Sequence, residues 1–175
     1  MDQLWKEILW SQFGASIDML GNALRLCPDE LWNASMWKDP VVGGKFSEFW
    51  YVAYHCLLWL DLYLSGSDEG FVPPGPFDLN ELDPQGLLPE RVFTRDELLQ
   101  YLSYCRNKCQ ETVEHLTDEK ATQLSTFPWK KDGLRFAELL LDNMRHVQEH
   151  TAQLGMFLGQ QAGMNNRWLA SPKQD

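Results

Sequence analysis

Residues 47–64 read SEFWYVAYHCLLWLDLYL, and this stretch decides the fold because it is apolar on nearly every side of a helix. A helix without a polar face is buried among its neighbours. Its most apolar part, residues 49–60, is too short to cross a bilayer, which needs about 20 residues. The hydroxyl of Ser47 can cap this helix, and Gly66 can end it. We therefore predict a helix over residues 47–64 that is the most buried of its bundle.

Two other segments show the same helical periodicity with a clearer polar face. Residues 2–27 carry apolar side chains three and four positions apart, and Pro28 ends the pattern. Residues 94–116 carry a similar stripe. They begin with Thr94 and Glu97, whose side chains can each bond the other's backbone N–H in a capping box. Both segments are predicted as amphipathic helices.

A fourth helix is predicted over residues 133–161, with Asp132 as its N-terminal cap. The segment before it, residues 117–132, contains a proline and has no helical stripe. No part of the chain alternates apolar and polar residues as a half-buried strand does, so we predict no strand. The expected fold class is all-α, a four-helix bundle.

Residues 65–93 form an unusually long connection, rich in proline and glycine, between the second and third predicted helices. An 18-residue helix is about 27 Å long. A connection of this length can return along the bundle, so that the third helix starts at the same end as the second. The prediction is an up-down-down-up bundle with a long crossover loop.

The composition indicates one small domain with a large core. The chain has 175 residues, of which 44% are hydrophobic, and a formal net charge of −10. We assign residues 1–163 to a single bundle domain and residues 164–175 to a polar tail that is expected to fray. An acidic surface repels phosphate groups, which disfavours binding to nucleic acids and to anionic membranes.

The sequence favours a cytoplasmic location. Its first residues, MDQLWKE, lack the basic start and apolar centre of a signal peptide. The four cysteines form no CxxC pair and have apolar neighbours. We interpret them as free, buried thiols in a reducing compartment rather than as disulfides or metal ligands.

The chain has four histidines, and three of them form a candidate metal site. His146 and His150 are four residues apart, which places both imidazoles on one face of a helix. His55 lies inside the most apolar helix, where an unpartnered imidazole costs about 1–3 kcal/mol. Two interpretations of this histidine pattern remain open. The three rings share one metal ion, or His55 bonds a core tyrosine or carbonyl while the pair faces solvent. His115, near the end of a helix, reads as a surface cation.

These residues resemble a known family. The segments Tyr54–Trp59 (YHCLLW) and His146–His150 (HVQEH), in this order around a long Pro/Gly-rich loop, are similar to those of the DinB/YfiT-like superfamily of metal-dependent proteins. Residues 26–32 (LCPDELW) are similar to its first segment. The resemblance covers about residues 1–160. It implies a four-helix bundle, a nickel or zinc ion on His55, His146 and His150, frequent homodimers, and in some members the transfer of low-molecular-weight thiols.

Three neutral imidazoles leave coordination positions open for a small-molecule substrate, as catalytic sites do. The leading hypothesis is a divalent-metal-dependent transferase, conjugating a small thiol to an electrophile, or a hydrolase. The alternative is a non-catalytic metal-binding or interaction bundle. No catalytic residue is assigned. Asp142 is a candidate to orient His146, Asn143 a candidate for the mouth of the site, and Glu149 points away around the helix.

We also expect a homodimer. The second predicted helix is apolar all round, and Trp50, Tyr54 and Trp59 exceed what one bundle is expected to cover. Excess apolar surface usually marks an interface.

Overall fold

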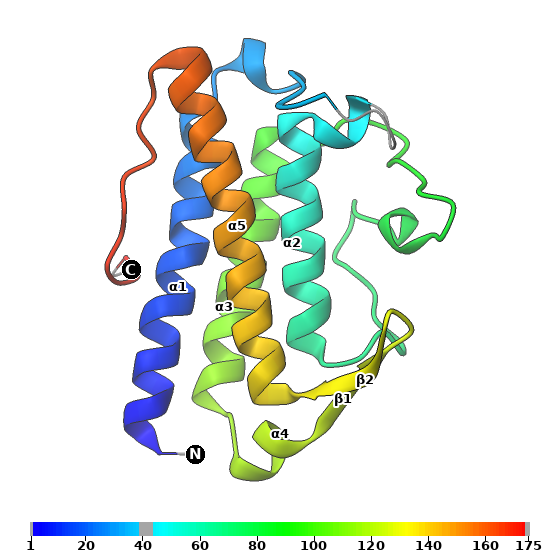
Figure 1. Ribbon diagram of the computed structural model, residues 1–175, viewed down its shortest axis with the longest axis vertical. Helices are drawn as coiled ribbons and strands as arrows, with labels where there is room; N and C mark the ends of the chain where they lie inside the picture. Colours follow the sequence, from blue (N-terminus) through cyan, green and yellow to red (C-terminus); the bar gives the residue numbers. More distant parts are fainter. Residues whose placement is uncertain (1, 39–43, 174–175) are drawn as a thin grey trace.

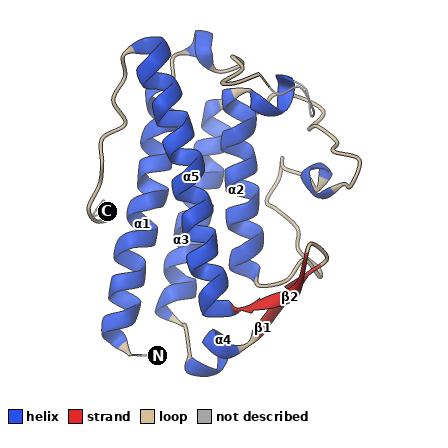
Figure 2. Cartoon of the chain, viewed as in Figure 1, coloured by secondary structure: helices blue, strands red, loops and turns tan. Residues whose placement is uncertain are grey.

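The computed structural model describes residues 2–38 and 44–173 of the chain. Within these ranges, four long helices pack side by side, and a small antiparallel hairpin lies at one end of them (Figures 1 and 2). The long helices are α1 (Gln3–Leu26), α2 (Phe49–Ser65), α3 (Arg95–Glu114) and α5 (Phe136–Ala162). The shorter elements are α4 (Asp118–Thr122), β1 (Leu124–Phe127), β2 (Lys130–Arg135) and the 3-10 helices Asp29–Leu31, Gly44–Ser47 and Asn80–Leu82. The predicted four-helix bundle is confirmed.

Contacts between helix ends confirm the up-down-down-up topology (Figure 1). The guanidinium of Arg95, at the start of α3, donates to the Cys27 carbonyl at the end of α1, at 2.6 Å. The ammonium of Lys6, at the start of α1, donates to the Glu114 carbonyl at the end of α3, at 2.9 Å. The backbone N–H of Trp50, in the first turn of α2, donates to the Trp32 carbonyl just after α1, at 3.1 Å. Helices α2 and α3 therefore both start near the end of α1 and run in the same direction, and the crossover between them returns along the bundle.

Helix α2 is the most buried helix, as predicted. Fourteen of its residues are buried. The crossover covers it from outside, because Phe77 and Phe93 pack on Tyr54 with ring centroids 6.0 and 4.9 Å away. Trp50 and Tyr54 are thus covered by the chain itself, with 4% and 0% exposure. At these two residues the expected excess apolar surface is absent, whereas Trp59 is partly exposed, and the homodimer itself stays a prediction.

Both predicted caps at Ser47 and Asp132 are wrong. The Ser47 hydroxyl lies 2.8 Å from the carbonyl oxygens of Trp37 and Gly44, at the end of a 3-10 turn. Helix α2 starts at Phe49, with Glu48 as its N-cap. Asp132 lies in β2, and the cap of α5 is Arg135. In each case the residue predicted as a cap belongs instead to a neighbouring short element, the 3-10 helix Gly44–Ser47 or the strand β2, which the sequence did not reveal.

The hairpin and α4 replace the predicted linker. Strands β1 and β2 pair antiparallel, with Leu124 opposite Arg135 and Phe127 opposite Lys130. Their side chains alternate only weakly in polarity, and the pairing is irregular between Ser125 and Phe127. The prediction of no strand failed because so short a hairpin has no distinct periodicity.

The tail is docked rather than frayed over its described part, residues 164–173. The backbone N–H of Lys173 donates to the buried carboxylate of Asp18 at 2.7 Å. The guanidinium of Arg106 bonds both the Asp18 carboxylate and the Lys173 carbonyl, at 2.9 and 2.8 Å. Buried charge therefore fixes a segment whose polarity indicated disorder. Residues 174 and 175 lie outside the described ranges.

None of the helices in the described part of the chain combines the length and hydrophobicity that a membrane span requires.

Candidate metal centre

Helices α2 and α5 bring the three predicted histidines together. His55 lies midway along α2, and His146 and His150 face it from successive turns of α5. The Nε2 atom of His146 is 3.3 Å from that of His55 and 3.0 Å from that of His150. One ligand atom from each residue lies within 4.8 Å of the others, an arrangement that could hold a metal ion.

The spacing of the three nitrogens fits a small divalent ion. Imidazole nitrogens bind zinc at about 2.0–2.1 Å, so two ligands in tetrahedral or octahedral geometry lie about 2.9–3.4 Å apart. The separations of 3.0 and 3.3 Å between the Nε2 atom of His146 and those of His150 and His55 fall in this range. Neutral imidazoles that turn their Nε2 lone pairs toward one point repel one another unless a cation lies between them. The donor set therefore suits a divalent metal.

Two of the rings are oriented by acceptors behind them. The Nδ1 atom of His55 lies 2.5 Å from the Glu81 carboxylate, and that of His150 lies 2.8 Å from the Gln153 side-chain oxygen. Each oxygen accepts the Nδ1 proton, which leaves the Nε2 lone pair free for a metal. The Nδ1 atom of His146 is buried and has no hydrogen-bond partner among the described residues.

Glu81 is the functional residue that sequence reasoning missed. It belongs to the 3-10 turn Asn80–Leu82 in the crossover, and its side chain is 7% exposed. Besides His55, its carboxylate accepts hydrogen bonds from the Tyr51 hydroxyl and, at 3.2 Å, from the Trp59 indole N–H. The sequence did carry one signal for such an acceptor. Residues 51, 55 and 59 are hydrogen-bond donors spaced four apart, so they share one face of a helix.

Burial and hydrogen bonding set the charges at the centre. Burial, reinforced by the other histidines, lowers the pKa of His146 to about 2 and also lowers the pKa of His150. Neutral imidazole is the form that ligates metal, so these two rings are held in it. Burial alone raises the pKa of Glu81, but the hydrogen bonds from His55, Tyr51 and Trp59 outweigh it, and the pKa is lowered. An anion thus lies directly behind His55, one of the three converging rings.

The other candidates around the centre take different places. Asp142 does not orient His146, because its carboxylate accepts from the Lys130 ammonium at 2.8 Å. Asn143 is wrong as a mouth residue, since it is fully buried and donates to the Leu60 carbonyl at 3.0 Å. Glu149 is exposed, as its helical position predicted. His115 is exposed at the end of α3, outside the cluster, which confirms its surface assignment.

A pocket of about 450 Å³ opens beside His146. Its polar lining includes Lys130 and Arg145 together with Asp142 and Glu149, two cations and two carboxylates. Tyr63 also lines this pocket and contacts the aromatic side chain at the hairpin turn. The Trp129 indole packs edge-on against Trp59, with centroids 5.0 Å apart, and donates to the Tyr63 hydroxyl at 3.3 Å. The hairpin thus forms one side of the approach to the centre.

None of the four cysteines is placed to act as a nucleophile. All four are free and buried, as predicted. Burial raises the pKa of Cys56, the neighbour of His55 in the chain, and likewise that of the other three. A thiol is a good nucleophile only as the thiolate, which burial disfavours.

The comparisons with known proteins agree with this geometry. The sequence model described as the DinB superfamily matches residues 12–154, a segment that contains all three histidines. Searches of curated proteins and of solved structures gave no match. The match extends over most of the chain, from within α1 to the last third of α5. The chain therefore belongs to the DinB superfamily.

Proposed function

We propose that this protein binds one divalent metal ion through His55, His146 and His150 and uses it to transform a small molecule. One observation carries the proposal. Three Nε2 atoms converge at metal-bridging distances, and acceptors behind His55 and His150 keep those atoms unprotonated. Three protein ligands leave open positions, which is the composition of a catalytic rather than a structural site.

The reaction that we favour is conjugation of a low-molecular-weight thiol to an electrophile, with hydrolysis as the related choice. A divalent ion on three neutral imidazoles supplies Lewis acidity toward a thiol or water of the substrate. The protein contributes the pocket beside His146, where Lys130 and Arg145 can bind acidic groups of a substrate. The ring of Tyr63, which lines this pocket and bonds Trp129, supplies an apolar surface for the substrate.

Nickel and zinc are the metals that we propose, because both suit imidazole ligands. The ligand set His55, His146 and His150 holds no carboxylate, so a bound ion would keep its full charge and would favour anionic substrates. The Glu81 carboxylate bonds the Nδ1 atom of His55, on the side of the ring away from the converging Nε2 atoms.

A non-catalytic metal-binding bundle is the second candidate. The hydrogen bonds of Glu81 support it. The two carboxylate oxygens of Glu81 accept three hydrogen bonds, so this carboxylate is not free to transfer a proton to or from a substrate. In this case the ion serves stability or assembly rather than turnover.

An activity assay separates the two candidates. The purified protein is loaded with zinc or nickel and mixed with an electrophilic aromatic chloride and each of several small thiols. The transferase proposal expects metal-dependent product formation that is lost in His150→Ala and kept in His115→Ala. Full metal binding without turnover by any thiol, and without hydrolysis of ester probes, favours the non-catalytic bundle.

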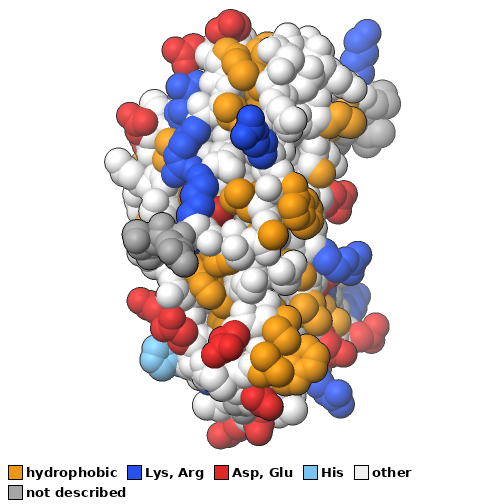
Figure 3. Space-filling model, turned by 90° about the vertical axis from the view of Figure 1, so that its left-hand side faces the viewer, with side chains coloured by type: hydrophobic (Ala, Val, Ile, Leu, Met, Phe, Trp, Pro, Cys, Tyr) orange, Lys and Arg blue, Asp and Glu red, His pale blue; other side chains and the backbone are white. Residues whose placement is uncertain are grey.

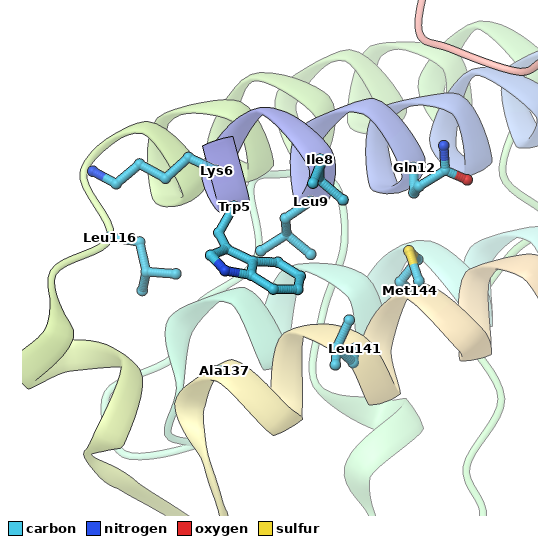
Figure 4. Close-up of a pocket in the computed structure, with 9 residues that line it drawn as sticks. All are labelled: Trp5, Lys6, Ile8, Leu9, Gln12, Leu116, Ala137, Leu141 and Met144. Atoms are coloured by element: carbon cyan, nitrogen blue, oxygen red, sulfur yellow. The ribbon is translucent and has the colours of Figure 1, made fainter. Parts of the chain in front are cut away.

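We also propose a homodimer, on a different face from the one that the sequence indicated. Hydrophobic side chains gather low on the face that α1 and α5 share (Figure 3). There, an apolar pocket of about 310 Å³ lies between the two helices, with the Trp5 indole beside Leu141 and Met144 (Figure 4). Trp5 is 62% exposed and Leu141 is 49% exposed. A two-fold axis places the same patch on both partners, so a protruding indole next to an apolar pocket is suited to a second copy.

Light scattering at micromolar concentration tests the dimer. We expect a dimer mass for the wild type and a monomer mass for Trp5→Glu. The matched control is Trp168→Glu, at another exposed tryptophan, in the tail. A monomeric wild type would contradict the proposal, as would a Trp5→Glu variant that remains dimeric.

The cytoplasmic location remains part of the proposal. The four free, buried cysteines support it, because unpaired thiols are typical of reducing compartments.

A further inference from the structure

The crossover loop touches the candidate metal centre through one side chain. Tyr51, His55 and Trp59 follow one another at four-residue intervals on α2, and all three donate to the Glu81 carboxylate. This carboxylate is 7% exposed, and its pKa is lowered by these bonds. A buried anion with three convergent donors has a defined position, so the turn that carries it is fixed against α2.

Most other hydrogen bonds of the turn around Glu81 join residues of the crossover to one another. The backbone N–H and the side-chain amide of Asn80 bond the carboxylate of Asp78, at 2.9 and 3.1 Å, which shapes the turn itself. The Tyr54 hydroxyl donates to the Asp78 carbonyl at 3.3 Å, a longer bond. Glu81 therefore provides the charged attachment of this part of the crossover to α2.

We propose that Glu81 is a positioning residue that couples metal binding at His55 to the order of residues 78–83 in the crossover. The inference rests on the proposed metal site and adds a regulatory element to it. The crossover becomes a strap that is held more tightly when the ion is bound.

The physical basis is the hydrogen bond between His55 and Glu81, at 2.5 Å. A metal on Nε2 withdraws electron density from the ring and makes its Nδ1 proton more acidic, which strengthens the bond to the carboxylate. In return, the carboxylate makes the ring a better electron donor toward the metal. Because coupling between two binding events is reciprocal, metal must stabilise the strap by the same free energy with which the strap stabilises metal.

The strap also bonds two aromatic side chains of α2 that lie beside His55. Tyr51 packs against His55 with ring centroids 6.5 Å apart, and Trp59 does so at 6.0 Å. Both rings donate to the Glu81 carboxylate that orients His55, Trp59 to the same oxygen and Tyr51 to the other one. Release of the turn would therefore loosen these two neighbours of His55 together with the ligand itself.

The first test needs no variant. Hydrogen–deuterium exchange is measured on the wild-type protein with and without zinc, and peptides that cover residues 78–83 are followed. We expect zinc to slow exchange in these peptides, whereas the docked tail near Lys173 stays unchanged. Zinc binding without any change at residues 78–83 would overturn the coupling.

The second test uses Glu81→Gln, which keeps the size of the side chain and removes its charge. Zinc affinity, measured by competition with a chelator, is expected to fall by about 10-fold to 100-fold. Saturating zinc should no longer protect residues 78–83. Glu81→Asp, which restores the charge on a shorter side chain, should recover part of the affinity. Glu90→Gln is the matched control, because Glu90 is exposed on the same crossover.

The outcomes separate this inference from the proposed metal site. If the wild type binds no metal, the proposed function fails. If the wild type binds zinc and Glu81→Gln binds it equally well with equal protection of the strap, only the role of Glu81 fails. A Glu81→Gln variant that does not fold leaves the decision to the wild-type exchange measurement.

Discussion

At the scale of single residues, His146 stands between the other two histidines, and its Nδ1 atom is buried without a partner in the described part of the chain. The ligand residues could be predicted because helical spacing and burial are local properties of the sequence. Glu81 could not be paired with His55 in the same way, since 26 positions and a loop separate them. The places of Asp142 and Asn143 were likewise decided by partners on other elements, Lys130 and Leu60.

Gln153 gives a prediction at this scale. Its side-chain oxygen accepts the Nδ1 proton of His150 at 2.8 Å, and a neutral acceptor orients the ring without adding charge. We expect Gln153→Ala to lower zinc affinity by about 10-fold, near the lower end for residues behind a ligand. Chelator competition measures this, with Gln160→Ala on the same helix as the control. An unchanged affinity in Gln153→Ala would show that the ring needs no such support.

At the scale of elements, helices were predictable wherever their start and end signals are local. The start of α3 is an example, because Thr94 and Glu97 form the predicted capping box. The starts of α2 and α5 were predicted wrongly, because their true positions depend on a 3-10 turn and on the β1–β2 hairpin. Pairing between two short strands is non-local and leaves little trace in either strand.

The capping box of α3 predicts a pH dependence of stability. The hydrogen bonds from Arg91, followed by those from Thr94, lower the pKa of Glu97 from 4.5 to about 2. A carboxyl whose pKa is lower in the folded state stabilises the fold above pH 4.5, and this contribution is lost as the pH falls from 4.5 toward 2.

Urea unfolding between pH 7 and pH 3 measures this contribution. Glu97→Gln should be less stable than the wild type at pH 7, and the difference should shrink as the solution is acidified through pH 4.5. The exposed pair with Arg91 is screened by solvent, so the effect comes mainly from the cap, whose loss costs about 1 kcal/mol. A difference that stays constant with pH would contradict the assignment.

At the scale of the whole molecule, the topology followed from one long crossover, whereas the docking of the tail did not follow from composition. Residues 164–173 are polar, but the buried carboxylate of Asp18 and the guanidinium of Arg106 bind their backbone. A hydrogen bond of this kind depends on where two helices meet and cannot be read from the tail itself. The same holds for the apolar face of α1 and α5, which appears only when the helices are packed.

The docked tail predicts a loss of stability on breaking its anchor. Asp18→Asn weakens the bonds to Arg106 and to the Lys173 backbone, and it removes a buried negative charge opposite Arg106. We expect the free energy of unfolding to fall by about 2 kcal/mol. Limited proteolysis should also release the tail faster. The exposed Asp96→Asn serves as the control. Wild-type stability and an equally protected tail in Asp18→Asn would refute the role of this anchor.

The measurement that tests the central claim most directly is the metal content of the purified protein by atomic absorption. It compares the wild type with His55→Ala, His150→Ala and His115→Ala. The three-histidine centre predicts about one divalent ion per chain in the wild type and in His115→Ala, and a sharp loss in the other two variants. Equal metal in the wild type and in His55→Ala would contradict the account, because the ion would then not bridge α2 and α5.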